Sequence, residues 1–185
     1  MILFRCFAWD EAAGPRARGG PLWFPRMLQG DGRHDNPSVY GCLYVSSEPV
    51  SAAVERLARL AGTSIAQSDL VRRGFPLALA AIELSDQAEL VDLDEPAVLL
   101  EEELRPSRVA TNDRSVTQVQ AEDLFSRHQH AAGLRWWSTF ESLWANLTLF
   151  DRAETGLRVE DVQSLEVGDD VVRDAADFLG LSVSS

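Results

Sequence analysis

The segment Gly30-Asp31-Gly32-Arg33-His34-Asp35-Asn36-Pro37 is rich in residues that favour turns, and its composition predicts a loop. The apolar run Cys42-Leu43-Tyr44-Val45 follows it and predicts a short strand. After this run, Ser47-Glu48-Pro49 places a capping residue, an acid and an early proline at the start of a helix. These three features predict a loop–strand–helix unit around which the rest of the chain is arranged.

The predicted helix has one apolar side and ends at Gly62, a residue suited to a C-terminal cap. Glu55 lies at the border of the apolar side, so its carboxylate can face a partly dry cleft shared with Arg33 and Tyr44. The alternative is a solvated acid on the helix surface that pairs with Arg59, four residues further on. The apolar positions recur at helical spacing: Val50, Ala53, Val54, Leu57, Leu60 and Ala61.

The composition indicates an ordinary globular chain. With 185 residues and a hydrophobic fraction of 45%, we expect a single domain over residues 1–185. The motifs fall within residues 2–150, and residues 151–185 are expected to add a C-terminal strand and helix to the same domain. No apolar run is long enough to cross a bilayer, and residues 1–5 lack the pattern of a secretory signal. The sequence therefore predicts a cytoplasmic protein with no membrane partner.

The charge distribution narrows the classes of ligand. A formal net charge of −12 argues against binding to a nucleic-acid backbone. Arginines concentrate between Arg5 and Arg33, whereas Asp86 to Glu103 and the C-terminal region are acidic. An anionic small molecule or a basic protein partner would each find a complementary region. The two cysteines, Cys6 and Cys42, are expected to be buried thiols, and with three histidines in the whole chain we expect no metal site.

The remaining pattern alternates short strands with helices. Strands are predicted at Ile2–Ala8, Phe75–Leu84, Glu89–Leu93, Leu134–Trp137, Leu143–Phe150 and Val159–Val167, and helices at Thr117–Ala132 and Asp169–Leu179. The triplet Glu101-Glu102-Glu103 is expected on a solvated surface. The chain has no glycine motif of a Rossmann or P-loop site and no serine-hydrolase elbow. These features favour an α+β fold, with a mixed β-sheet core and surrounding helices.

Three separated pieces of the chain carry a further pattern. The first is Leu3-Phe4-Arg5-Cys6-Phe7. The second joins the loop and strand quoted above to Ala52-Ala53-Val54-Glu55. The third consists of Thr117-Gln118, Gly133-Leu134-Arg135-Trp136-Trp137-Ser138 and Asn146-Leu147-Thr148-Leu149-Phe150. In this order and spacing the pieces resemble the RES domain family, which is named for its arginine, glutamate and serine.

The chain departs from the family's pattern at three places. His34-Asp35 stands where the family usually has tryptophan, and Asp31 replaces the first glycine of a Gly-Gly-Arg motif. Trp137 replaces the proline that usually precedes the serine. These differences bear on substrate preference and on activity.

The resemblance implies a fold like the catalytic core of ADP-ribosylating toxins. It also implies an enzyme that cleaves the nicotinamide–ribose bond of NAD+, either by hydrolysis or with phosphate as a co-substrate. NAD+ would be the substrate, and no cofactor would be required. Family members are commonly bacterial toxins that deplete NAD+ and arrest growth, each held inactive by an antitoxin with an Xre-like DNA-binding domain. The chain would then form a toxin–antitoxin hetero-oligomer or a homo-oligomer.

The chemistry of this bond suggests roles for the matching residues, because the reaction passes through a cation-like sugar attached to a diphosphate. The arginines would clamp the diphosphate, the tyrosine would stack on nicotinamide or its ribose, and the glutamate would stabilise the developing cation. The structural alternatives are an ion pair for Arg5, a core position for Tyr44, and turn positions for Ser138 and Asn146. The candidates are catalytic Glu55, Arg5 and Ser138, and NAD+-binding Arg33, Tyr44 and Asn146.

Two other functions stay open at this point. An ADP-ribosyltransferase that modifies a protein would use the same residues. A catalytically degenerate RES domain acting as an acidic interaction protein is the other alternative, and the altered loop from Asp31 to Asp35 is the feature that favours it.

Overall fold

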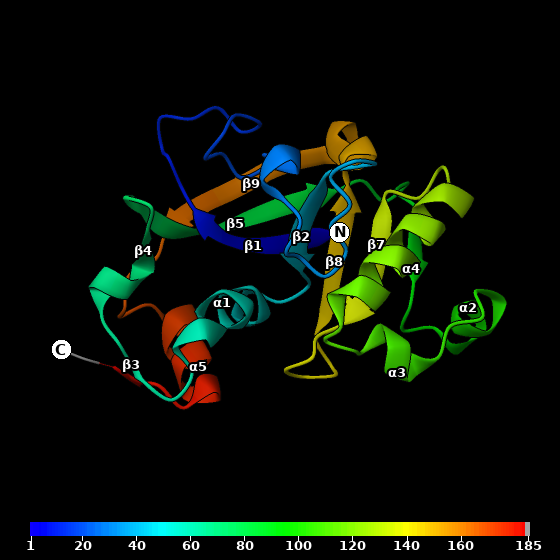
Figure 1. Cartoon of the computed structure of the whole chain (residues 1–185). Helices are drawn as coiled ribbons and strands as arrows, with labels where there is room; N and C mark the ends of the chain where they lie inside the picture. The colour runs from blue at the N-terminus through cyan, green and yellow to red at the C-terminus, as the bar shows by residue number, and fades with distance from the viewer. Residues whose placement is uncertain (184–185) are drawn as a thin grey trace. The chain divides into compact units, whose positions relative to one another are not determined.

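The strand predicted after the loop is β2 (Cys42–Ser46), and the helix that follows it is α1 (Pro49–Leu57). In the computed structural model, which describes residues 1–183, the chain divides into two compact units (Figure 1). Unit 1 comprises Met1–Trp23, Val45–Leu84 and the chain from Arg158 onward, and unit 2 comprises Phe24–Tyr44 and Ser85–Leu157. The boundary between Tyr44 and Val45 lies inside β2. That residues 1–185 together form a single domain stays a prediction.

Unit 1 is built on antiparallel strands and two helices. β1 pairs with β5 along its whole length, from Ile2 opposite Glu83 to Ala8 opposite Leu77, and β4 and β9 also pair with β5. Figure 1 shows α1 and α5 next to each other on one side of β1 and β5. The elements are β1 (Ile2–Ala8), α1, β3 (Ser64–Ile65), β4 (Val71–Arg72), β5 (Phe75–Leu84), β9 (Leu157–Ser164), α5 (Asp170–Leu179) and β10 (Ser182–Val183), with 3-10 turns at Ala58–Leu60 and Gln67–Leu70.

The core of unit 1 follows from the two periods of its elements. From Ala78 to Leu84 every second residue of β5 is fully buried, as a strand with one inward face requires, and the helices bury residues three and four positions apart. The buried residues are Ala78, Ala80, Ile82 and Leu84 on β5, Ala53, Val54 and Leu57 on α1, and Val172, Ala175 and Ala176 on α5. The predicted apolar stripe of the helix after β2 is confirmed at Ala53, Val54 and Leu57, but Val50 and Leu60 are only half-buried and Ala61 is exposed.

Unit 2 contains a second group of strands with three helices. β7 pairs in parallel with β6 and antiparallel with β8, and β8 also neighbours β2. The rings of Tyr40, Phe125 and Phe150 pack with centroids 4.5 to 5.0 Å apart in its core. The remaining elements are β6 (Leu90–Asp92), α2 (Pro96–Glu101), α3 (Pro106–Val109), α4 (Arg114–Arg127), β7 (Gly133–Trp137) and β8 (Ala145–Phe150), with 3-10 turns at Arg26–Leu28 and Asp151–Gly156. The predicted α+β class, a mixed β-sheet core with surrounding helices, is confirmed.

Several local predictions were wrong. The N-cap of α1 is Glu48 rather than Ser47, and no side chain caps the helix there, so Pro49 marks its start. Leu143 is 89% exposed in the loop before β8, because β8 begins only at Ala145. Val119, expected on the apolar side of its helix, is 67% exposed. That helix starts earlier than predicted because the carboxylate of Asp113 accepts a hydrogen bond from the Ser115 N–H at 3.0 Å.

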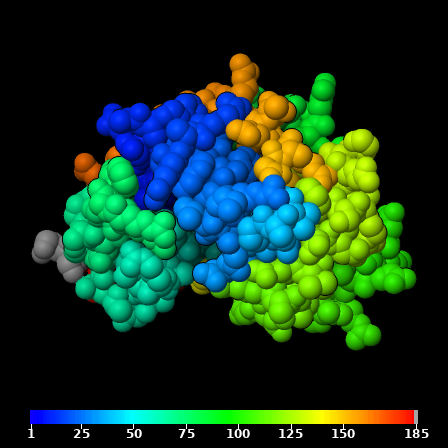
Figure 2. Space-filling view, turned by 45° about the horizontal axis from the view of Figure 1, so that its top comes forward, coloured from blue at the N-terminus to red at the C-terminus, as the bar shows by residue number. Residues whose placement is uncertain are grey.

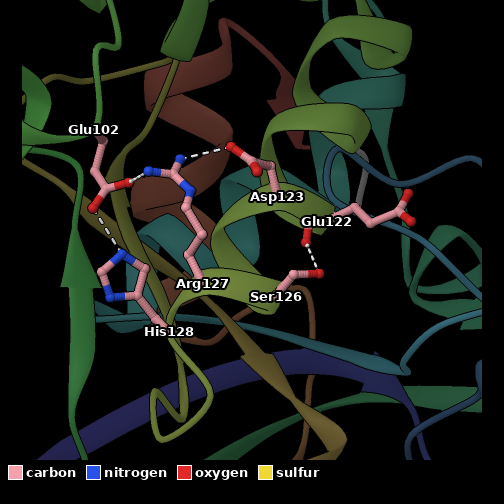
Figure 3. Close-up of polar contacts among 6 residues, drawn as sticks. All are labelled: Glu102, Glu122, Asp123, Ser126, Arg127 and His128. Carbon is pink, nitrogen blue, oxygen red and sulfur yellow. Dashed lines mark hydrogen bonds and ion pairs between the residues drawn. The ribbon is translucent and has the colours of Figure 1, made fainter.

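The acidic triplet after α2 was also predicted incorrectly at its middle residue. Glu101 and Glu103 are exposed, but the Glu102 side chain is only 4% exposed. Figure 3 shows its carboxylate between Arg127 and His128, with Oε1 2.7 Å from Nε2 of His128 and Oε2 paired with Arg127. Arg127 also pairs with Asp123 at 2.6 Å. A buried carboxylate is tolerated here because two nitrogen donors face it.

We predict that Glu102→Gln destabilises the protein by about 1–3 kcal/mol, because the amide presents a donor to Arg127 where an acceptor was buried. Glu101→Gln removes the same charge from an exposed neighbour, and its free energy of unfolding should stay within about 0.5 kcal/mol of that of the unmodified protein. Chemical denaturation followed by tryptophan fluorescence measures both. Equal effects of the two substitutions would show that Glu102 does not act as a buried structural partner.

Candidate functional site

The residues predicted for the site divide between the two units. In unit 1 they are Arg5 on β1 and Glu55 on α1. In unit 2 they are Arg33 in the loop before β2, Tyr44 on β2, Ser138 directly after β7 and Asn146 on β8. The four residues of unit 2 lie on β2 and β8, in the loop before β2 and directly after β7.

The guanidinium of Arg5 is held against the loop that follows β1. Its Nη1 donates to the carbonyl oxygen of Pro21 at 2.5 Å and lies 3.4 Å from that of Gly20. Its Cζ lies 5.0 Å from the centroid of the Phe7 ring. Burial, and then the charge of Arg56, lowers the pKa of Arg5 to about 10, so the side chain stays charged at neutral pH. Within residues 1–183 no carboxylate pairs with Arg5, and its charge is held by neutral groups.

Glu55 lies on the solvent side of α1. Its neighbour Val54 is fully buried and Arg56 is half-buried, whereas Glu55 itself is exposed. The sequence placed Glu55 at the border of the apolar stripe, and the observed helix turns it outward from that border. The carboxylate is therefore presented at the surface of unit 1 by a helix whose other side is anchored in the core.

Asp35 organises the loop that contains Arg33. Its Oδ2 accepts hydrogen bonds from the backbone N–H groups of Gly30 at 2.9 Å and Gly32 at 2.7 Å. Its Oδ1 accepts the phenolic O–H of Tyr44 at 2.7 Å, and the Tyr44 oxygen in turn accepts the His34 N–H at 3.0 Å. Burial raises the pKa of Tyr44 well above its usual value, so the phenol keeps the proton that it donates. One buried carboxylate thus fixes both the loop and the orientation of Tyr44.

Gly32 is required by this arrangement. A Cβ at Gly32 would lie 2.6 Å from Oδ1 of Asp35 and 2.6 Å from the Tyr44 hydroxyl oxygen. Both atoms are fixed by hydrogen bonds, so neither can move away cheaply. The glycine before Arg33 therefore lets the loop approach β2 closely.

The motif Thr117-Gln118 holds the same loop from the other side. The hydroxyl of Thr117 donates to the carbonyl oxygen of Arg33 at 2.5 Å. The side-chain amide of Gln118 donates to the carbonyl oxygens of Gly30 at 3.0 Å and Gly32 at 2.9 Å. Two sequence pieces more than eighty residues apart thus meet in unit 2.

The side chain of Arg33 is fixed by its own set of contacts. Its Nη1 donates to the carbonyl oxygens of Val109 at 3.0 Å and Thr111 at 2.7 Å. Its Cζ lies 4.7 Å from the ring centroid of Trp136, a cation–π distance. Some of the N–H groups of Arg33 are therefore already hydrogen-bonded within unit 2.

A buried polar group lies beside Arg33. Nδ1 of His34 is 2.8 Å from Oγ1 of Thr148, which also accepts the indole N–H of Trp136 at 3.2 Å. The rings of His34 and Trp136 meet edge to face at 5.4 Å. Burial, and then the charge of Arg33, lowers the pKa of His34 to about 3, so the imidazole is neutral at physiological pH. This histidine fixes Trp136, on which Arg33 rests.

Ser138 and Asn146 are both buried at the far end of the β7–β8 pair. Ser138 is 2% exposed, and its Oγ accepts the Phe140 N–H at 3.1 Å while its own N–H donates to the Trp144 carbonyl oxygen at 2.8 Å. Asn146 is 3% exposed and stands opposite Trp136 in the strand register. These contacts show that Ser138 helps to form a turn, as the structural alternative predicted. A role in binding would be additional.

We predict that Asp35→Ala destabilises the protein by about 2–4 kcal/mol, because three hydrogen-bond donors in and beside the loop lose their acceptor. Asp31→Ala removes an exposed carboxylate from the same loop and should change stability by less than about 0.5 kcal/mol. Urea titrations of both variants make the comparison. A similar small effect for both would contradict the organising role of Asp35.

The roles of Asp35, His34 and Thr148 were missed by sequence reasoning. His34 and Asp35 were noted only as departures from the family's pattern. A usable signal existed for Asp35, since an aspartate shortly after two glycines often accepts hydrogen bonds from the turn's own backbone. No comparable local signal existed for Thr148, whose partner His34 is 114 residues away.

Residues 1–183 contain no cluster of three or more histidine, cysteine, aspartate or glutamate side chains placed to hold a metal ion. In the same residues no helix has the length and apolar character needed to span a membrane. The thiols of Cys6 and Cys42 are unpaired by disulfides, and burial raises the pKa of both, to about 12 for Cys6.

The chain is similar to known proteins in two respects. The RES domain family matches residues 3–170. Among solved structures, the chain is similar to the crystal structure of the M. tuberculosis MbcT–MbcA toxin–antitoxin complex, with a TM-score of 0.59 and 17% identity over 97% of this chain and 87% of that one. No curated protein matches the sequence. The structural likeness establishes the fold, and because the family match covers most of the sequence, the chain belongs to the RES domain family.

Proposed function

We propose that this chain is an enzyme that cleaves the nicotinamide–ribose bond of NAD+, and that it acts as the toxin of a toxin–antitoxin pair in the bacterial cytoplasm. The observation that carries the proposal is the family match over residues 3–170, which includes all six candidate positions in the two units. The structure of MbcT–MbcA, a toxin–antitoxin complex of the same fold, supports the pairing with an antitoxin.

The charges of the candidate residues suit the bond to be broken. When the bond between the ribose carbon and the nicotinamide nitrogen breaks, the electron pair leaves with nicotinamide, and positive charge develops on the ribose. A carboxylate held by a rigid helix stabilises such charge, and Glu55 is held by α1 in this way. Tyr44 adds a neutral phenol ring whose orientation Asp35 fixes.

Arg5 and Arg33 are proposed to bind the diphosphate of NAD+. Each has a guanidinium that is anchored by backbone carbonyl groups and by an aromatic ring, and a guanidinium held in this way loses little entropy on binding phosphate. The hydroxyl of Ser138 is proposed to donate a hydrogen bond to phosphate or ribose, and Asn146 is proposed to contribute to NAD+ binding.

The second reactant decides the class of enzyme. If water attacks the ribose carbon, it loses a proton to solvent and the products are nicotinamide and ADP-ribose. If phosphate attacks, the products are nicotinamide and ADP-ribose-1″-phosphate. No cofactor takes part in either scheme.

We propose to test this function by incubating the purified chain with NAD+, with and without phosphate, and identifying the products. Release of nicotinamide is the expected result, and the ribose-containing product distinguishes hydrolysis from phosphorolysis. Transfer of ADP-ribose to a protein would replace this proposal with a transferase. NAD+ that stays intact would favour a domain that acts through binding alone.

The partner is proposed to be an antitoxin with an Xre-like domain that keeps the enzyme inactive, as a hetero-oligomer. Co-expression with the neighbouring gene tests this part separately. Stable co-purification together with loss of NAD+ cleavage is the expected result.

A further inference from the structure

The indole of Trp136 on β7 packs against the guanidinium of Arg33 and has little surface of its own. Trp136 is 7% exposed, and Cζ of Arg33 lies 4.7 Å from the centroid of its ring. Arg33 is half-buried in the segment before β2. Figure 2 shows this segment, in light blue, at the surface of unit 2 beside the yellow-green atoms of α4. A buried indole under a cation at the surface acts on a ligand through that cation.

A chain of hydrogen bonds orients the indole. An indole N–H can only donate, so Oγ1 of Thr148, 3.2 Å from Nε1 of Trp136, accepts this hydrogen bond. The hydroxyl of Thr148 keeps its own proton to donate, and Nδ1 of His34 lies 2.8 Å away as the acceptor. This direction puts the single proton of the neutral imidazole on Nε2. All three side chains are buried, so water does not compete for these hydrogen bonds.

The register of β7 and β8 puts these groups on one face of the strand pair. Trp136 stands opposite Asn146, and Leu134 stands opposite Thr148. Side chains that stand opposite each other in antiparallel strands share a face, and so do alternate residues along one strand. Asn146 and Thr148 therefore flank Trp136 on the face where the indole meets Arg33. Arg33 and Asn146, both proposed to bind NAD+, have Trp136 as a common neighbour.

The indole and the backbone hold different parts of the guanidinium. The carbonyl oxygens of Val109 and Thr111 accept hydrogen bonds from Nη1, at 3.0 and 2.7 Å, and fix one end of the group. The ring of Trp136 restrains its centre. A guanidinium that is held at both places is already ordered, so it loses less conformational entropy when it binds a phosphate group.

We propose that Trp136 is a positioning residue for NAD+ binding: its indole, oriented through Thr148 by His34, holds Arg33 in the direction in which Arg33 meets the diphosphate. The identity of this ligand rests on the proposed function. His34, which departs from the family's pattern, has in this chain the task of completing the hydrogen bonds behind the indole. Loss of the indole therefore weakens NAD+ binding and leaves the rate of bond cleavage nearly unchanged.

The first test follows the Arg33 side chain and needs no reaction. In nuclear magnetic resonance spectra of the 15N-labelled chain, the Arg33 Nε–H signal is assigned by its loss in Arg33→Lys. Trp136→Leu should speed exchange of this proton with water about 5- to 30-fold, the factor that corresponds to loss of a cation–π contact. Unchanged exchange in Trp136→Leu would overturn the proposal.

Thr148 and Leu149 provide the comparisons that separate positioning from stability. Thr148→Val removes the hydroxyl and should also speed the exchange, whereas Thr148→Ser keeps the hydroxyl and should restore the slow rate. Leu149 is fully buried on the opposite face of β8, so Leu149→Ala should lower stability but leave the exchange within about twofold. Should Trp136→Leu fail to fold, the Thr148 pair decides, and equal exchange in Thr148→Val and Thr148→Ser would overturn the proposal.

The second test measures affinity for NAD+. Calorimetry in the slowly reacting Glu55→Gln background gives the dissociation constant, and steady-state kinetics without that substitution give KM and kcat. Trp136→Leu should raise the dissociation constant and KM about 5- to 30-fold, with kcat within a factor of about three. Thr148→Ser and Leu149→Ala should keep KM within about twofold of the unmodified chain.

The outcomes separate this role from the proposed reaction. Affinity for NAD+ that depends on Trp136, in a chain that leaves NAD+ intact, would uphold the positioning role and reject the reaction. Cleavage of NAD+ with equal affinity in Trp136→Leu and the unmodified chain would overturn the positioning role and leave the reaction standing. Absence of NAD+ binding by the unmodified chain would overturn the positioning role as well.

Discussion

Replacing Glu55 by glutamine should lower kcat/KM for NAD+ cleavage by roughly two to three orders of magnitude, which corresponds to about 3–4 kcal/mol of transition-state stabilisation. The substitution keeps the size and hydrogen-bonding shape of the side chain but removes the negative charge that we propose stabilises the developing cation. Because Glu55 is exposed and the core side of α1 is formed by other residues, the variant should fold with near-normal stability. The loss should therefore be in turnover, with KM for NAD+ changed much less.

Glu48→Gln is the matched control for this prediction. Glu48 is an exposed acid at the start of the same helix, its side chain makes no capping hydrogen bond, and its replacement removes the same charge. Its kcat/KM should stay within about a factor of two of the unmodified chain. Near-normal turnover in Glu55→Gln, or an equal loss in both variants, would contradict the role of Glu55. Steady-state measurement of nicotinamide release gives both constants.

The stability of the protein should fall as the pH falls from about 6.5 toward 3, and His34 should account for a large part of the loss. The folded state holds the pKa of His34 near 3, whereas the unfolded chain binds a proton near 6.5. Between these values the unfolded state binds more protons, so the free energy of unfolding rises with pH by about 1.4 kcal/mol per unit. Over the two units from pH 6.5 to 4.5 the contribution is about 2–3 kcal/mol.

His34→Asn tests this assignment, because its amide can replace Nδ1 as the partner of Thr148 and does not titrate. The variant should show a shallower fall in unfolding free energy below pH 6.5 than the unmodified chain. His128 and His130 are present in both proteins, so their contributions cancel in the comparison. Urea titrations at pH 7.5, 6.5, 5.5 and 4.5 measure the two slopes, and parallel slopes would show that His34 is not held neutral.

The elements with a strong local pattern were predicted well. The strand Phe75–Leu84 was predicted with its observed bounds, and the strand beginning at Cys42 ends one residue later than expected. Both are apolar runs between clear turn residues, so the local pattern of side chains is enough to predict them as strands. The start of α1 was less certain because Ser47, Glu48 and Pro49 each carry a helix-start signal, and only the proline acts as one.

The site was predicted less completely than the fold. The Arg33 loop and Thr117-Gln118 were both identified as parts of the family's pattern, and the structure shows the hydrogen bonds that join them. Asp35 was interpreted only as a departure from the family's pattern, and Glu102 was predicted to be a solvated acid. In the structure both carboxylates are buried and accept hydrogen bonds. Their partners come from distant segments of the chain, and such contacts leave no periodic trace in the sequence.

Release of nicotinamide from NAD+ by the unmodified chain, beside Glu55→Gln under the same conditions, tests the central claim most directly. The account predicts steady release by the unmodified chain and a rate lower by roughly two to three orders of magnitude in the variant, while both proteins unfold at similar denaturant concentrations. No release by the unmodified chain, with and without phosphate, would contradict it.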